Sequence, residues 1–280
     1  MQSFCTFKPN NPELKKYISY YYLDTADNAD LENRYICYPH FNTTLSFYKS
    51  NSFHYQNHHT QIHFQENASY LKILTPLRKE PLMVSQYGAK HKVAVVFEPL
   101  GLNHFIQTSY NNISFGCPVI FNAFDQDIDI LLDQIFKETA TEQLTTLLDN
   151  FFVSKLTAFS NPYLENALRL LHQVEHDIGV NTIAEKKLGI SRRQLNRLFN
   201  QHLGTSPQKY RHIVRFRHAM NSKIFQDAVI NYTELAFKAQ YTDQSHFTKT
   251  CKQLTGYTPK SFFNKGKHIG SEDIFWVFPR

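Results

Sequence analysis

Residues 243–262, DQSHFTKTCKQLTGYTPKSF, carry the most informative pattern in this chain. The apolar residues of this stretch recur every three or four positions, which predicts an amphipathic helix. Asp243 precedes this pattern and is a candidate N-cap, because its side chain can accept a hydrogen bond from the free N–H groups of the first turn. Gly256 can close the helix in a left-handed conformation, and Pro259 can begin the next helix. The stretch therefore predicts a capped helix, a tight turn and a second helix.

The same design occurs 52 residues earlier, in SRRQLNRLFNQHLGTSPQKY, residues 191–210. Capping, apolar and turn positions correspond in the two copies: Ser191 with Asp243, Leu195 with Phe247, Phe199 with Cys251, Gly204 with Gly256, and Pro207 with Pro259. Upstream, Ile183-Ala184 matches Leu235-Ala236 at the same offset. A short helix, a turn and a second helix that buries one apolar stripe form a helix-turn-helix unit. The chain is predicted to contain two such units.

The outward positions of the two second helices are polar. They are Arg192, Arg193, Asn196, Arg197 and Asn200 in the first copy, and Gln244, Ser245, Thr248, Lys249 and Lys252 in the second, with His246 at the margin. Arg, Asn and Gln carry the paired donors and acceptors that recognise base edges in a major groove, whereas Ser, Thr and Lys suit phosphates. A solvated face is the alternative for one helix alone. Two copies at a constant offset favour DNA contact.

The segment between the units, residues 206–226, has apolar residues in helical register. About 19 helical residues span about 28 Å, and two reader helices on one face of DNA sit about 34 Å apart. One continuous helix would therefore place two readers in adjacent major-groove segments. The basic residues on it have two interpretations, phosphate contact and simple solvation: Arg211, Arg215, Arg217 and Lys223.

Length and charge agree with two parts of different character. The 280 residues are 42% hydrophobic and 19% charged, enough for two cores. Residues 1–160 carry a net charge of −3 and residues 161–280 a net charge of +9, which favours a polyanionic partner for the second half. We see no signal peptide or membrane-length apolar run, and the four cysteines form no C-x-x-C pair. We therefore expect a cytoplasmic protein with reduced thiols.

The first half is predicted to be rich in β-strands. Aromatic and β-branched runs at 35–49, 69–77, 82–87 and 92–99 are separated by Pro and Gly. Helical spacing follows over 127–156, and Asn161-Pro162 is a candidate helix start. We expect an α+β protein with domains at 1–158 and 162–266 and a tail at 267–280. The aromatic residues Tyr38, Phe47 and Phe97 are interpreted as core, with a ligand pocket as the alternative.

The quoted segments closely resemble the DNA-binding domain of AraC/XylS-family transcription regulators. The resemblance covers about residues 163–265 and implies an all-α domain of two helix-turn-helix units joined by a long helix. The site residues that it and the outward pattern imply are Arg192, Arg193, Asn196, Arg197, Gln244, Ser245, His246, Thr248 and Lys249. Two departures stand out: Gln240-Tyr241 replaces the usual Gly-Phe, and one extra residue before Ser191 predicts a bulge or a shifted helix end near Lys186-Lys187.

The N-terminal half resembles, more loosely, the cupin-like barrel domains of the same regulators, notably in VAVVFEPLGLNHFI, residues 93–106. The resemblance implies a sequence-specific activator of the bacterial cytoplasm and nucleoid, with double-stranded DNA and RNA polymerase as partners. It also implies control by a small effector or by homodimerisation. The sequence leaves the effector site unknown.

Enzyme chemistry is the rival interpretation. His54, His58, His59 and His63 lie close in sequence, so a metal-dependent cupin-type enzyme fused to a DNA-binding module is the alternative. The segment is predicted to be strand, turn and strand, which separates the pairs that a helix would unite. No catalytic, nucleotide-binding or zinc-protease motif is present. We therefore expect no enzyme activity, no catalytic residues, no metal and no cofactor.

Overall fold

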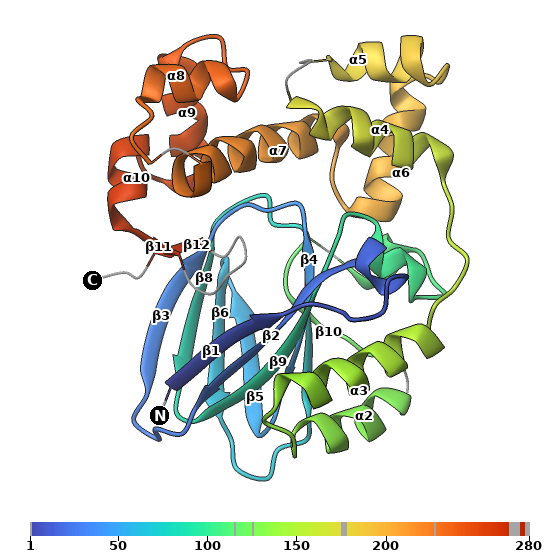
Figure 1. The fold of residues 1–280 in the computed structure, drawn as a ribbon, viewed down its shortest axis with the longest axis vertical. Helices are drawn as coiled ribbons and strands as arrows, with labels where there is room; N and C mark the ends of the chain where they lie inside the picture. Colours follow the sequence, from blue (N-terminus) through green and yellow to red (C-terminus); the bar gives the residue numbers. More distant parts are fainter. Residues whose placement is uncertain are drawn as a thin grey trace.

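The computed structural model describes residues 2–114, 116–124, 126–174, 178–226, 228–268 and 275–277. A β-rich N-terminal half is followed by two helices along its flank and then by a helical C-terminal half (Figure 1). The helical half covers one end of the strands, and α7 lies across that end. The predicted α+β fold with β-rich and helical halves is confirmed.

The N-terminal half is built on two six-stranded sheets. Sheet A has the order β1 (Gln2–Phe7), β2 (Ile18–Ala26), β9 (Lys90–Phe97), β4 (Thr43–Tyr48), β7 (Leu71–Thr75) and β10 (Val119–Ile120). Sheet B has the order β11 (Gly266–His268), β12 (Phe275–Val277), β3 (Glu32–Cys37), β8 (Leu82–Tyr87), β6 (His59–Phe64) and β5 (Asn51–Gln56). Neighbouring strands are antiparallel except β6 and β8, which are parallel.

Sheet A is buried on both faces, which explains its long apolar runs. Its outer face packs against α2 (Asp127–Ile135) and α3 (Thr141–Ser154), where Phe47 and Phe97 share a core with Leu148. Its inner face, which includes Tyr22, turns toward sheet B. The predicted helical stretch is thus two helices, and the core interpretation of Phe47 and Phe97 is confirmed.

The helical half follows the duplicated pattern of the sequence. The first unit contains α4 (Pro162–His172), α5 (Val180–Thr182), a π-helical turn (Ile183–Lys187) and α6 (Arg192–Leu203). The connecting helix is α7 (Pro207–Asn221), continued by a π-helical turn (Ser222–Gln226). The second unit contains α8 (Tyr232–Lys238), α9 (Gln244–Thr255) and α10 (Pro259–Lys265).

The predicted caps of the two reader helices, α6 and α9, are present. Ser191 Oγ accepts from Gln194 N at 3.1 Å, and Asp243 Oδ1 accepts from His246 N at 2.7 Å. At the other end, Gly204 and Gly256 have φ of 65° and 80°. Each cap satisfies backbone groups that the helix itself leaves unpaired, so local sequence fixes both ends of both readers.

Both departures from the family pattern have structural consequences. Gln240 has φ of 59°, a left-handed conformation that costs a residue with a Cβ roughly 1 kcal/mol. In the first unit the additional residue is taken up by the π-helical turn, where Leu188 N donates to Ile183 O at 3.0 Å. The predicted bulge near Lys186-Lys187 is therefore confirmed.

The two cap glycines lead to a paired stability prediction. We expect Gly256→Ala to lower the free energy of unfolding by about 1 kcal/mol, because its Cβ meets only open space and left-handed strain is the main cost. Gly204→Ala should cost more, since its Cβ would lie 3.3 Å from Tyr110 Cε1 in the N-terminal half. Urea unfolding of both variants measures the difference; equal losses would contradict the close packing at Gly204.

The interpretation of the basic residues on the connecting helix as phosphate-binding or solvated is wrong for Arg217. Its side chain is buried, and its Nε donates to Pro39 O of the N-terminal half at 2.8 Å. Arg215 Nε donates to Ala239 O at 3.1 Å, and Lys223 Nζ donates to Ile230 O at 2.7 Å. These cations therefore serve internal contacts, which periodicity alone does not reveal.

Part of the predicted tail joins the N-terminal half. Val277 pairs with Ile36 and position 276 pairs with Cys37, so β12 extends sheet B beside β3. β11 pairs in turn with β12. Residues 269–274 and 278–280, on which the rest of the tail prediction falls, lie outside the described residues. The last strands of the chain thus link the second unit to a sheet formed by the first half.

Candidate nucleic-acid interface

The first reader helix, α6, has one buried and one exposed side. Leu195 and Phe199 are fully buried in the core of the first unit, as predicted. Arg192, Arg193 and Arg197 are exposed, and none has an ionic partner among the described residues. Three guanidinium groups on one helix, with no carboxylate to neutralise them, form a surface that attracts phosphate and base-edge acceptors.

Amide side chains between these arginines bond to their own helix. Asn196 Nδ2 donates to Arg192 O at 3.1 Å, and Asn200 Nδ2 donates to Asn196 O at 2.8 Å. Asn196 therefore has to exchange this bond for a base contact, whereas no such bond is found for the three arginines within the part of the chain that the structure describes. The guanidinium groups are the stronger candidates in this helix.

The second reader helix, α9, has the same division. Phe247 and Cys251 are fully buried, and burial raises the pKa of the Cys251 thiol to about 11, which agrees with a packing role. The accessible side carries the predicted outward residues Gln244, Ser245, His246, Thr248, Lys249 and Lys252. Every residue predicted to face DNA therefore lies on the accessible side of its helix.

Two residues of the second face are positioned by neighbours. Gln244 Oε1 accepts from Thr233 Oγ1 of α8 at 2.7 Å, which leaves the amide nitrogen to donate elsewhere. The ring of His246 lies edge-on to Tyr241, with centroids 5.3 Å apart. A side chain already held in place loses less entropy on binding, so Gln244 is the best prepared contact of α9.

The C-terminal end of α6 rests on the N-terminal half (Figure 1). Asn103 Nδ2 donates to His202 O at 3.0 Å, and Lys79 Nζ donates to Gly204 O at 3.2 Å. A lysine at this end also interacts favourably with the helix dipole. Since α6 has 12 residues, Arg192 and Arg193 lie about 16 Å away, at the opposite end. This contact leaves the arginine-rich end of α6 free.

Residues 38–42, between β3 and β4, touch both units; we call them the bridging segment. Tyr38 is 1% exposed and its ring meets Phe262 of the second unit edge-on, with centroids 4.7 Å apart. Phe41 is half-buried and packs against the core of the first unit, with its ring centroid 4.9 Å from that of His172. Between them, Pro39 O accepts from Arg217 of α7. The bridging segment therefore contacts both units and the helix that joins them.

Arg78 fixes the bridging segment from inside the N-terminal half. Its Nε donates to Tyr38 O at 3.2 Å, and its Nη2 donates to Asn42 Oδ1 at 2.8 Å. His40 and Arg78 also exchange backbone hydrogen bonds. A movement of the Arg78 side chain would therefore displace the bridging segment, which contacts both helix-turn-helix units.

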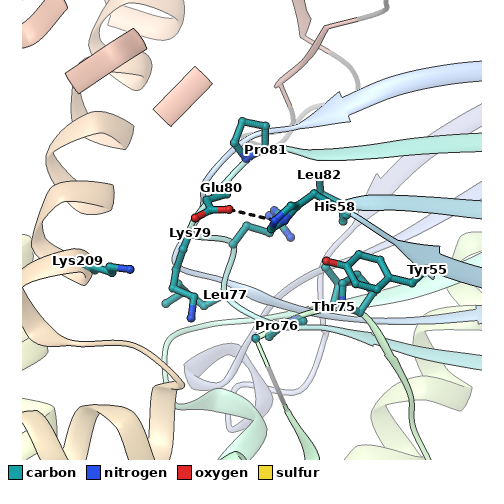
Figure 2. A pocket seen from close by; sticks show the side chains of 13 residues that line it. Tyr55, His58, Thr75, Pro76, Leu77, Lys79, Glu80, Pro81, Leu82 and Lys209 are labelled. Atoms are coloured by element: carbon teal, nitrogen blue, oxygen red, sulfur yellow. Dashed lines mark ion pairs between the residues drawn. The ribbon is translucent and has the colours of Figure 1, made fainter. Parts of the chain in front are cut away.

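A pocket of about 230 Å³ lies between the halves, beside Arg78 (Figure 2). Lys79 and Lys209 are among its lining residues, and His58 pairs with Glu80 at 3.3 Å within it. The other histidines of the cluster have separate neighbours: His59 Nε2 lies 2.8 Å from Ser85 Oγ, and His63 stacks on Tyr87. Among the described residues, no three His, Cys, Asp or Glu side chains gather as a metal site would require.

Residues 183–265 match the family model of the helix-turn-helix domain. The chain is 31% identical over 80 residues to the HTH-type transcriptional regulator GlxA of Rhizobium meliloti, covering 29% of this chain and 24% of that protein. It is 24% identical over 142 residues to the uncharacterized HTH-type transcriptional regulator YtdP of Bacillus subtilis, covering 48% and 18%. The chain thus aligns with a quarter or less of each curated relative.

A solved transcriptional regulator of Chromobacterium violaceum with an AraC-type DNA-binding domain is 30% identical. The match covers 36% of this chain and 88% of that one, with a TM-score of 0.32. Residues 183–265 are thus a helix-turn-helix domain of the AraC type. In the described part of the chain, no helix is both long and apolar enough to cross a membrane.

Sequence reasoning did not find the contacts between the AraC-type domain and the N-terminal half. The bridging segment has the sequence YPHFN. Nothing in this pattern shows whether its aromatic residues pack in the core of the N-terminal half or against a helix-turn-helix unit. One signal was available for the sheet interior. In KHKVAVVF (90–97), the side chains at 90, 92, 94 and 96 lie on one face of the strand, because side chains alternate between the two faces. If that face is buried, it therefore includes Lys90 and Lys92.

Proposed function

We propose that the protein is a sequence-specific DNA-binding transcription regulator that reads two adjacent major-groove segments. One observation carries the proposal: α6 and α9 repeat the same capped design and present exposed cationic and amide side chains. The positive charge of the second half supports it, because cationic residues supply most of the affinity for the phosphate backbone. The proposed base readers are Arg192, Arg193, Asn196 and Arg197 in α6, and Gln244, Ser245, His246, Thr248 and Lys249 in α9.

The proposed division is a regulatory domain at 1–158 and a DNA-binding domain at 162–266. Control by a small effector or by dimerisation would act through the first domain. The bridging segment supports such control, because it contacts both units and α7. A shift in this segment would alter the placement of the two readers relative to each other, on which simultaneous binding depends.

Homodimerisation is the second part of the proposed control. Ile130 of α2 is 63% exposed and Val153 of α3 is 40% exposed, so both helices carry apolar side chains on their outer side. Activation through RNA polymerase stays a prediction from the family resemblance. Because DNA is the proposed ligand, the proposed place of action is the bacterial cytoplasm, at the nucleoid.

Selection of bound DNA from a random pool tests the proposed function, and point variants test the readers. On the selected sequence, we expect Arg193→Ala or Gln244→Ala to weaken binding by about 1–3 kcal/mol and to relax preference at one or two base pairs. Lys252→Ala, at the basic end of α9, should weaken all sequences alike. It should also reduce the dependence of log Kd on log salt by about 0.9. Fluorescence anisotropy at two salt concentrations measures both effects.

Lys137→Ala is the matched control, because this exposed lysine follows α2, on the flank of the N-terminal half. Its affinity and salt dependence should equal those of the unchanged protein. If Arg193→Ala and Gln244→Ala also bind like the unchanged protein, these residues do not read bases. If no sequence is enriched in the selection, the proposed function is wrong.

A further inference from the structure

The space between the two sheets contains buried charge. Lys90 and Lys92 of β9 are each 5% exposed and lie on the face that turns toward sheet B. Burying an ammonium group costs several kcal/mol unless an opposite charge and hydrogen bonds compensate it. The two lysines differ in how that cost is offset.

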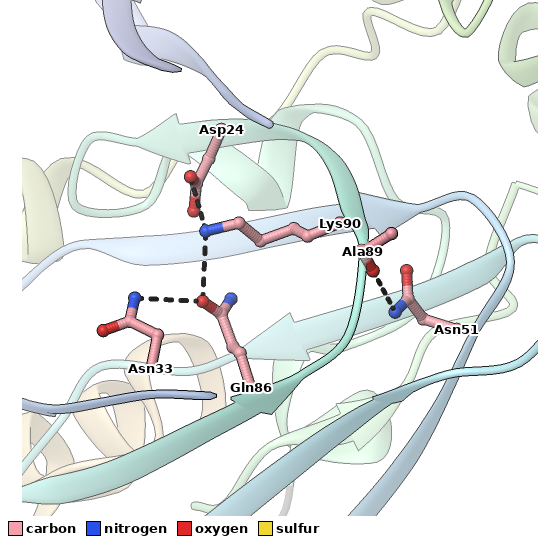
Figure 3. Close-up of polar contacts among 6 residues, drawn as sticks. All are labelled: Asp24, Asn33, Asn51, Gln86, Ala89 and Lys90. Carbon is pink, nitrogen blue, oxygen red and sulfur yellow. Dashed lines mark hydrogen bonds and ion pairs between the residues drawn. The ribbon is translucent and has the colours of Figure 1, made fainter. Parts of the chain in front are cut away.

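Lys90 has its counter-charge within the protein (Figure 3). Its Nζ lies 2.6 Å from Asp24 Oδ1 and donates to Gln86 Oε1 at 3.1 Å. Asn33 Nδ2 donates to the same amide oxygen at 3.5 Å. Asp24 is itself 2% exposed, so this carboxylate and Lys90 neutralise each other in a buried pair.

Lys92 has no ionic partner among the described residues. Its Nζ lies 4.8 Å from the ring centroid of Tyr22 and 5.2 Å from that of Tyr48. These two cation–π contacts, a side-chain hydrogen bond with Tyr48 and the charge of Asp24 offset part of the several kcal/mol that burial of the ammonium costs. Asp24 is already the counter-charge of Lys90, so two buried ammonium groups share one carboxylate. A small anion beside Lys92 would complete the charge balance.

A cavity of about 60 Å³ adjoins Lys92, between the sheets. None of the described residues that line it is acidic, and Arg78 is a second cation in its wall. Thr60 lines it too, is 5% exposed, and its Oγ1 has no hydrogen-bond partner among the described residues. A buried hydroxyl without a partner costs about 1–3 kcal/mol, so this cavity holds an unused donor beside a cation that has no carboxylate of its own.

The volume limits the ligand. One water-sized sphere needs about 10–15 Å³, so 60 Å³ holds a molecule of about four to six non-hydrogen atoms. Ile73 and Val84 make part of the wall apolar. We propose that this cavity binds a short-chain monocarboxylate, with its carboxylate at Lys92 Nζ and Thr60 Oγ1 and its hydrocarbon chain against Ile73 and Val84.

The proposed site lies next to the pocket between the halves and to the residue that holds the bridging segment. Thr75, Arg78 and Leu82 line both this cavity and the pocket between the halves. Arg78 also holds the bridging segment. The carboxylate would thus be the effector of the regulator proposed above, and the inference rests on that function for its biological meaning. Binding to the cavity itself is measured without DNA.

Isothermal titration calorimetry of the full chain with butyrate, at constant ionic strength, tests the site. We expect saturable binding at one site and at least about tenfold weaker binding of butyramide, its neutral isostere, because a hydrogen bond to a charged group is lost. Lys92→Met preserves side-chain length but removes the charge, and should weaken butyrate binding by about tenfold or more. Lys209→Met removes a charge from the outer pocket and should leave butyrate affinity unchanged.

Three results would overturn the inference: no binding of butyrate, propionate or acetate by the folded protein, equal affinity for butyrate and butyramide, or loss of binding in Lys209→Met but not in Lys92→Met. If circular dichroism shows that Lys92→Met is unfolded, Thr60→Val replaces it, with a several-fold loss expected. DNA binding is scored separately. Sequence-specific DNA binding without carboxylate binding removes only this inference, and the reverse result removes only the proposed function.

Discussion

Replacing Tyr38 by alanine should lower the free energy of unfolding by about 3–5 kcal/mol, the usual cost of deleting a large buried aromatic side chain. The ring is 1% exposed and lies in the core of the second unit, among Phe216 and Phe262. It comes from the N-terminal half, so its loss also removes a contact that holds the second unit in place. Urea unfolding followed by circular dichroism measures the loss.

Two controls separate these effects. Tyr38→Phe keeps the edge-on contact with Phe262 and should retain most of the stability. Phe47→Ala removes an equally buried aromatic side chain from the core beneath α2 and α3, so it should cost similar stability. Of these variants, only Tyr38→Ala should lose more affinity for DNA that contains both recognised segments than for DNA that contains one of them. A stability loss under 1 kcal/mol would contradict the packing of Tyr38 described here.

Combining Arg193→Ala with Gln244→Ala should weaken binding to the selected DNA by about 2–6 kcal/mol. The two residues lie on different reader helices, and changes at distant, independent sites add. Each side chain is expected to supply about 1–3 kcal/mol of base discrimination. Fluorescence anisotropy with the single and double variants measures the sum. A double variant no weaker than the worse single variant would mean that only one unit reads bases.

DNA spacing provides the control for this experiment. Inserting five base pairs between the two recognised segments turns one of them by about half a helical turn, so both readers no longer face the same side. The unchanged protein should then lose about as much affinity as a variant with one reader disabled. Ten inserted base pairs restore the rotation but not the distance, so affinity should stay low. Full recovery would contradict a rigid α7.

Short-range sequence determined the reader units. Ser191 and Asp243 cap α6 and α9, and Gly204 and Gly256 end them. These roles depend on the backbone conformation of a few consecutive residues, so they can be predicted without the rest of the chain. The buried stripe of each helix, and hence its outward residues, follows from the same 3.6-residue period.

The family resemblance also marked two departures from the pattern. Gln240 stands where the family usually has glycine, and its φ of 59° is the left-handed conformation that glycine adopts more easily. The extra residue in the first unit was predicted to form a bulge or to shift the helix end, and a π-helical turn takes it up. Both follow from local chain geometry, because a turn of fixed shape must accommodate whatever residue occupies it.

Tertiary structure alone decided which side chains cross between the halves. Arg217 had the appearance of a phosphate-binding or solvated residue, yet it is buried against Pro39, which lies 178 positions away in the chain. Tyr38 was expected to be core, and it is, but the core belongs to the second unit. Periodicity tells whether a residue is buried and not which surface buries it, because that depends on contacts between distant parts of the chain.

The same limit applies to Lys92 and to the last strands. Local periodicity and turn residues were enough to predict two capped readers, the helix between them and a β-rich first half. That β12 joins sheet B, and that Lys92 lies beside a cavity lined by no carboxylate among the described residues, became visible only in the folded chain. The net charge around a buried cavity depends on every chain segment that lines it, so it cannot be predicted from the sequence of any one segment.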